Sequence, residues 1–350
     1  MSAGRASSAT MPTLLRRPNQ GKYYLYLGLI VILPAAALLF SRPAALQLRA
    51  AAVAAPGEPP WLPPHYAPLG AATCPARGRP LPVTRASLTS QSGQDGIISS
   101  IFAALNTTNR YYAEFGFNSP DWLGASGANT YQLALAGWRG LLLDGGNENA
   151  SINLRRHWLT PANIVPIFDG AGVPRALDYL SVDVDSVDLW MLRALLVAGY
   201  RPRLVSIEYN VNYALHSCVT QGWWATQRRV QRVYGNPNTY GTSLRAISRL
   251  AAEFRYALVY VENGFDAFLV PCELLAAHGF SAPTLESFQR FTCRAEHAPV
   301  EPAERSAALA DLMDYCVWAQ TGDRAAAVAA AAEEVLVRQR QSGCPAMFYE

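Results

Sequence analysis

The fold of this chain can be predicted from two segments, Tyr111-Tyr-Ala-Glu-Phe-Gly-Phe-Asn118 and Gly137-Trp-Arg-Gly-Leu-Leu-Leu-Asp144. Residues 111–115 are aromatic and apolar over a short run, which is typical of a buried parallel strand. Residues 141–143 predict a second buried strand, and the segment between the two predicts a helix that ends at Gly137. The stretch therefore predicts a strand, a turn, a helix and a second strand.

Two acidic residues and a glycine stand at the ends of these strands. Asp144 directly follows the second strand, while Glu114 and Gly116 close the first. An acid at the tip of the second strand, roughly 20–30 residues after a glycine turn, suits a ribose diol. Ser119-Pro120 replaces the second glycine of the usual turn, so an ordinary βαβ unit with a tight turn fits the spacing equally well.

Alternating strands and helices continue beyond this unit. We predict strands at 164–168, 180–184, 203–208, 256–261 and 267–270, and helices at 96–105, 189–198 and 242–254. Such alternation predicts an α/β fold with a mostly parallel, doubly wound sheet. The last two strands flank Asn263-Gly264, which predicts a late antiparallel β-hairpin. Residues 303–341 are rich in Ala, Glu and Arg and predict two further helices.

The N-terminal part predicts a membrane anchor. Residues 23–40 contain no charged side chain, and eighteen such residues are about enough to span a bilayer. Basic residues are more frequent before this segment than after it, which places the N-terminus in the cytoplasm. Residues 41–84 are rich in Ala and Pro and predict a stem without a core.

The predicted organisation is that of a single-pass type II membrane protein facing the Golgi or ER lumen. Its parts are a cytoplasmic tail (1–22), a transmembrane signal anchor (23–40), a stem (41–84), a globular domain (85–298) and a helical C-terminal extension (299–350). A cleaved signal peptide, which would make the protein secreted, and a plastid transit peptide are the alternatives.

Charge and cysteine content narrow the partners and the compartment. The net charge of +3 is too small to indicate nucleic-acid binding. All six cysteines follow the apolar segment, so disulfides in the lumen are possible, although the spacing does not determine their pairing. The sequence indicates no particular oligomeric state.

Six short motifs, taken in order, resemble those of the FkbM-type methyltransferases. They are Ser90-Gln-x-Gly-Gln-Asp95, Glu114-Phe-Gly116, Asn129-Thr130, Gly137-Trp-Arg-Gly-Leu-Leu-Leu-Asp144, Asp183-Val-Asp185 and Gly241-Thr-Ser-Leu244. The resemblance covers approximately residues 87–275 and implies a Rossmann-like class I enzyme that uses S-adenosylmethionine. It also implies O-methylation of a sugar, glycan or other small hydroxyl compound.

The resemblance assigns roles to the residues at the strand ends. It implies that Glu114 and Gly116 face the methionine part of the cofactor and that Asp144 holds its ribose. The predicted cofactor site is completed by Gln94, Asn118 and Asp169. The family often has Asp-Gly after its glycine turn, where this chain has Asn118-Ser-Pro-Asp121.

A second group of polar residues follows the next two predicted strands. Asp183 and Asp185 point to the same side of an extended strand, and Glu208 and Asn210 repeat the pattern. Strand ends in an open parallel sheet line the ligand crevice, so Asp183 or Glu208 is a candidate base, and Asp185 and Asn210 are candidate substrate ligands. Oxygen ligands of this kind also suit a divalent metal, with Asp183 and Asp185 as the first candidates. Alternatively, Asp185 or Asp188 caps the following helix.

His216 is a third candidate for the catalytic base, since histidine titrates near neutral pH. A structural role is the commoner one for a lone histidine.

Two other functions fit the same residues. A type II Golgi glycosyltransferase would use Asp183-Val-Asp185 to hold Mn²⁺ and a nucleotide sugar. A methyltransferase-like binding domain without catalytic activity would explain the altered turn at Ser119-Pro120.

Overall fold

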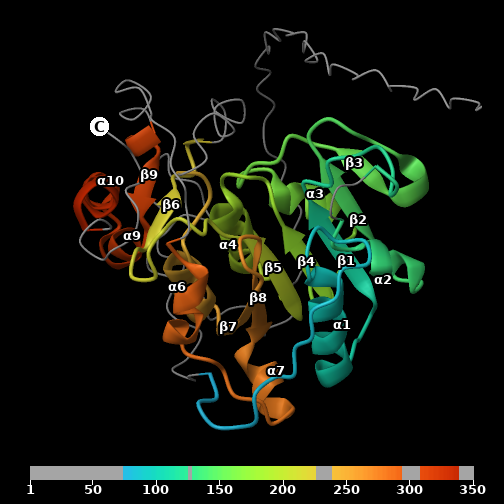
Figure 1. Ribbon diagram of the computed structural model, residues 1–350. Helices are drawn as coiled ribbons and strands as arrows, with labels where there is room; N and C mark the ends of the chain where they lie inside the picture. The colour runs from blue at the N-terminus through green and yellow to red at the C-terminus, as the bar shows by residue number, and fades with distance from the viewer. Residues whose placement is uncertain (1–73, 125–127, 226–238, 294–307, 339–350) are drawn as a thin grey trace, which may run out of the picture. The chain divides into compact units, whose positions relative to one another are not determined.

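The computed structural model describes residues 74–124, 128–225, 239–293 and 308–338, which are built around a seven-stranded sheet (Figure 1). Its strand order is β3-β2-β1-β4-β5-β8-β7. The strands are β1 (Tyr111–Phe115), β2 (Arg139–Asp144), β3 (Leu154–Arg156), β4 (Tyr179–Val182), β5 (Leu204–Glu208), β7 (Tyr256–Val261) and β8 (Asp266–Pro271). Strands β1 to β5 pair in parallel, whereas β8 is antiparallel to both β5 and β7. The prediction of a mostly parallel sheet with a late hairpin is therefore confirmed.

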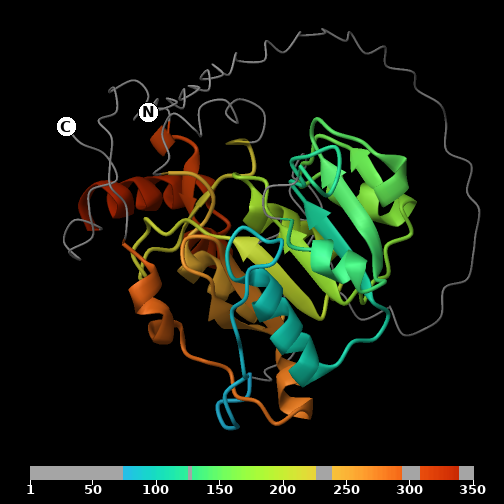
Figure 2. The ribbon, with the colours of Figure 1, turned by 45° about the vertical axis from the view of Figure 1, so that its right-hand side comes forward.

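Successive strand residues point to opposite faces of this sheet. Both faces carry apolar side chains, and helices cover both. Tyr111, Ala113 and Phe115 pack in one core and Tyr112 packs in the other. The helices of the first core are α3 (Ile164–Gly170), α4 (Asp188–Val197) and α6 (Leu244–Glu253). Those of the second core are α1 (Gln94–Leu105), α2 (Tyr131–Leu135) and α7 (Cys272–Ala277), which can be followed in Figure 2.

The predicted strand at residues 164–168 is wrong, because these residues form α3. Pro166 lies in the first turn of the helix, where its missing N–H is not needed, whereas it would interrupt a central strand. Ile164 and Phe168 are four residues apart and are buried on one helix face. The edge strand next to β2 is instead β3, whose three residues we did not predict as a strand.

The C-terminal extension packs on the domain through a second sheet. Two helices were predicted for residues 303–341, and the structure has α9 (Tyr315–Thr321) and α10 (Arg324–Glu333), followed by a π-helical turn, η5 (Glu334–Arg338). Before them, β9 (Leu312–Asp314) pairs antiparallel with β6 (Val219–Gln221). Figure 1 shows this C-terminal group beside β6.

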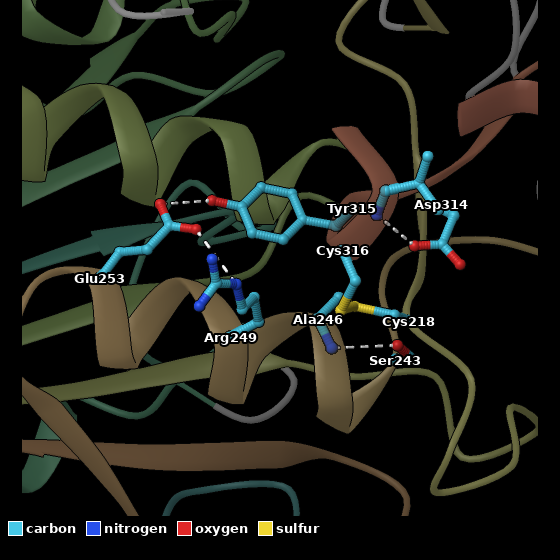
Figure 3. The surroundings of a disulfide bond; sticks show 9 residues. Cys218, Ser243, Ala246, Arg249, Glu253, Asp314, Tyr315 and Cys316 are labelled. Carbon is cyan, nitrogen blue, oxygen red and sulfur yellow. Dashed lines mark hydrogen bonds and ion pairs between the residues drawn. A yellow bond between two sulfur atoms is a disulfide. The ribbon is translucent and has the colours of Figure 1, made fainter. Parts of the chain in front are cut away.

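A disulfide and a buried polar group hold the extension in place (Figure 3). Cys218, just before β6, is bonded to Cys316 of α9. The hydroxyl of Tyr315 donates to Glu253 of α6, which also accepts a hydrogen bond from the fully buried Arg193. Burying the guanidinium is tolerable because the carboxylate pairs with it.

Residues 74–84, which we assigned to the stem, lie against the globular domain. Cys74 is disulfide-bonded to Cys272 of α7, and Arg79 forms a bridge with Phe280. Cys293 is disulfide-bonded as well. Residues 74–84 are therefore part of the globular unit.

The predicted tail and anchor, residues 1–40, lie outside the described residues, as does most of the stem. Among the residues that the structure describes, no helix is long and apolar enough to cross a membrane.

Candidate functional site

A cavity of about 760 Å³ opens at the carboxyl ends of the parallel strands. Strands β2 and β3 lie on one side of β1, and β4 and β5 lie on the other, so the cavity spans the point where the strand order reverses. Eight of the residues predicted for the site line it, namely Gln94, Glu114, Gly116, Asn118, Asp144, Asp183, Asp185 and Glu208. Asp169, Asn210 and His216 are not among the described residues that line it.

Glu114 holds the start of α2. Its Oε1 accepts from the Asn129 N–H at 2.8 Å and its Oε2 from the Thr130 N–H at 3.2 Å, and the Thr130 hydroxyl also donates to it. Burial raises the pKa of Glu114 to about 7, although these hydrogen bonds act in the opposite direction. Glu114 therefore contributes to the cavity mainly by positioning the turn that enters α2.

Gly116 brings the end of β1 against the end of β4. It has a φ of 70°, and a Cβ atom there would stand 1.9 Å from the carbonyl oxygen of Asp183. No other residue type fits without moving the backbone. The neighbouring backbone of Asp183 therefore requires a glycine at position 116, whether or not a ligand also approaches this turn.

Asp144 is held by the loops around it while one oxygen keeps capacity for a ligand. Its Oδ1 accepts from the N–H groups of Gly146 and Asn147, and from the Asn147 side-chain amide. Its Oδ2 accepts one hydrogen bond, from the Asn118 N–H at 2.9 Å. Because a carboxylate oxygen has two lone pairs, Oδ2 can accept a second hydrogen bond.

Trp158 is a cavity residue that the sequence analysis missed. It lies beyond β3, beside His157, whose N–H donates to the Asp144 carbonyl oxygen at 2.8 Å. Its side chain lines the cavity although 53% of the residue is exposed. An exposed indole at a cavity edge offers a flat surface for a planar ring. Trp158 follows a strand that we did not predict, β3, in a stretch without helix or strand.

The opposite end of the cavity is acidic. Carboxylate oxygens of Asp183, Asp185 and Glu208 all lie within 4.8 Å of one another. Burial, followed by the neighbouring carboxylates, raises the pKa of both Asp183 and Glu208 well above their usual values. Asp188 instead holds the loop before α4 by accepting from the Val184 and Ser186 N–H groups.

Two further acids lie on the β7–β8 hairpin, one of them in the cavity lining, and neither was predicted. Asp266 lines the cavity and accepts from the Gln94 side-chain amide at 3.0 Å, and burial raises the pKa of Asp266 to about 6. Glu262 is 1% exposed and accepts from Arg85 and Ser92. The hairpin therefore fixes the segment that carries Gln94.

Three predicted site residues have other partners. Asp169 belongs to α3, where it accepts from Arg175 and from the Tyr200 hydroxyl. The buried Asn210 accepts from the Asn212 N–H and donates to the Tyr240 carbonyl oxygen. His216 pairs with Glu334 of η5 at 3.0 Å. These contacts give all three residues structural roles outside the cavity.

The charge of the cavity is one-sided. Glu114, Asp144, Asp183, Asp185, Glu208 and Asp266 give it six carboxylates. Among the described residues that line it, His157 is the sole basic side chain and no Lys or Arg contributes.

The sequence matches no protein-family model, no curated protein and no solved structure.

Proposed function

We propose that the chain is an S-adenosylmethionine-dependent O-methyltransferase that acts on a sugar or glycan hydroxyl. The observation that carries this proposal is Asp144, at the end of β2, with capacity on Oδ2 and with the Gly116 turn beside it. A carboxylate in this position suits a ribose hydroxyl. The FkbM-type motifs point to the same cofactor.

The fold supports a Rossmann-like interpretation. The order β3-β2-β1-β4-β5, with helices on both faces, agrees with that of doubly wound nucleotide-binding sheets. Ligands of such sheets bind outside the carboxyl ends of the strands, where this cavity lies.

The cavity can hold both a nucleoside cofactor and an acceptor. Asp144 Oδ2 would accept from the ribose, and Trp158 would pack against the adenine ring. S-adenosylmethionine, when bound, supplies an electrophilic methyl group on a positively charged sulfur. The six carboxylates that line the cavity favour such a cation.

Asp183 and Glu208 would act on the acceptor hydroxyl. One of these carboxylates would accept the hydroxyl proton as the acceptor oxygen receives the methyl group, which S-adenosylmethionine would supply. A raised pKa makes the ionised carboxylate a stronger base than an ordinary aspartate or glutamate. Burial is the main cause of the raised pKa of both groups, and repulsion by the neighbouring carboxylates adds to it.

The disulfides support a lumenal location. Cys74–Cys272 and Cys218–Cys316 are bonded, and the described part of the chain contains no free cysteine. Such bonds persist in oxidising compartments such as the secretory pathway. A type II anchor at residues 23–40 completes this proposal.

A ligand screen on the full chain tests the proposal against the glycosyltransferase. Thermal unfolding is followed with S-adenosylmethionine, S-adenosylhomocysteine, UDP and GDP, each with and without Mn²⁺. We expect the two methionine-derived ligands to raise the melting temperature, since they bind the folded state. Stabilisation by UDP or GDP alone, dependent on Mn²⁺, would contradict the proposal. Binding of S-adenosylmethionine without turnover of any acceptor would favour a non-catalytic domain.

A further inference from the structure

We propose that the end of the cavity formed by Asp183, Asp185 and Glu208 binds a cation. The cation is either the ammonium group of an amine-bearing acceptor or a divalent metal ion that binds the acceptor hydroxyl. That the ligand is a methyl acceptor rests on the proposed function, but the binding of a cation itself requires no methyl donor. We refer to these three residues as the acidic subsite.

The geometry of the acidic subsite fits one small cation. Its carboxylate oxygens lie within 4.8 Å of one another. Oxygens bound to a single Ca²⁺ at roughly 2.3–2.6 Å are separated by at most about 5 Å. An ammonium group, with three donors, can bridge carboxylates at similar separations.

Two oxygen atoms in the cavity wall receive no hydrogen bond from the residues that the structure describes. One is Glu208 Oε2, which is buried. Asn129, which is 6% exposed, lines the same cavity, and its Oδ1 also accepts none. Buried acceptors left without a partner cost free energy, so both oxygens indicate a ligand that brings donors or positive charge.

The part of the chain that the structure describes places no Lys or Arg side chain at the acidic subsite. No Lys or Arg is among the described residues that line the cavity, and His157 is fixed at the Asp144 end. Neighbouring carboxylates repel one another unless a proton or a cation neutralises them. The same charge disfavours acceptors that carry phosphate, sulfate or carboxylate groups. The acceptor is therefore neutral or positively charged, and a neutral one binds together with a metal ion.

Direct binding to the full chain tests this inference. Mn²⁺ binding is measured by the loss of the free-ion signal in electron paramagnetic resonance. Binding of glucosamine, glucose and glucuronate is measured by calorimetry, with and without Ca²⁺. We expect either Mn²⁺ binding that Ca²⁺ competes away, which identifies a metal, or a preference of about tenfold or more for glucosamine over glucose, which identifies an ammonium group.

Matched variants locate the binding. Asp183→Asn and Glu208→Gln should each weaken it about tenfold or more, because each removes a charge from the acidic subsite. Asp169→Asn removes an acid that pairs with Arg175 outside the cavity, and it should bind as the wild type does. Melting temperatures establish that each variant folds.

The outcomes separate this inference from the proposed function. A wild-type chain that binds no Mn²⁺ and does not prefer glucosamine overturns the acidic subsite, whatever the variants do. Equal binding by wild type and both subsite variants overturns it as well. Cation binding without any binding of S-adenosylmethionine contradicts the methyltransferase and leaves the acidic subsite standing.

Discussion

Gly116 and Asp183 are in contact across the end of the sheet: a Cβ atom at Gly116 would stand 1.9 Å from the Asp183 carbonyl oxygen. This contact joins the turn after β1 to the loop after β4. It therefore links the two ends of the cavity, one at Asp144 and the other at the acidic subsite.

Gly116→Ala should be strongly destabilising. The added methyl group meets backbone, which cannot rotate away, and the residue has a φ of 70°. We expect a loss of roughly 2–4 kcal/mol in the free energy of unfolding, measured by denaturant titration. Gly137→Ala is the matched control, because its φ is 79° and nothing lies within 4 Å of its Cβ position. Equal losses in the two variants would show that the contact with Asp183 does not contribute to the free energy of unfolding.

Stability should decrease as the pH rises from about 4.5 to about 7. Burial raises the pKa of Glu114 to about 7 and that of Asp266 to about 6, so the folded state binds more protons than the unfolded state in this range. The unfolding free energy then falls by up to about 1.4 kcal/mol per pH unit for each group. Denaturant titrations across this range measure the slope. A stability that rises with pH throughout it would contradict the burial of these carboxyl groups.

The central sheet could be predicted because its strands are apolar runs that end in turn residues. Residues 111–115 and 256–261 agree with β1 and β7. Residues 164–168 have the same apolar character, but Pro166 favours a helix, as does the four-residue spacing of the buried Ile164 and Phe168. Composition alone does not separate a short buried helix from a buried strand.

The site was partly predictable for a different reason. Acids at strand ends, such as Asp144 and Asp183, are brought together by any parallel sheet. His216 pairs with Glu334, which is distant in the sequence and belongs to an extension whose docking depends on tertiary contacts. Trp158 and Asp266 enter the cavity from loop and hairpin positions that no periodicity indicates.

Asp183→Asn should separate chemistry from cofactor binding. The substitution keeps the shape of the side chain and removes a proton acceptor, so methyl transfer should slow by roughly 10²- to 10⁴-fold. The affinity for S-adenosylmethionine should stay nearly unchanged, because Asp144 and Trp158 lie at the other end of the cavity. Single-turnover methylation and calorimetry measure the two quantities. A variant with normal methyl transfer would exclude Asp183 as the base.

The central claim is that Asp144 holds the ribose of S-adenosylmethionine, and calorimetric titration of this ligand into the full chain tests it most directly. We predict that wild type binds and that Asp144→Ala weakens binding by roughly 1–3 kcal/mol, the range for a hydrogen bond to a charged group. Glu148→Ala is the control, since Glu148 is an exposed acid four residues further along the chain. Absence of binding to wild type, or equal affinity in Asp144→Ala, would contradict the claim.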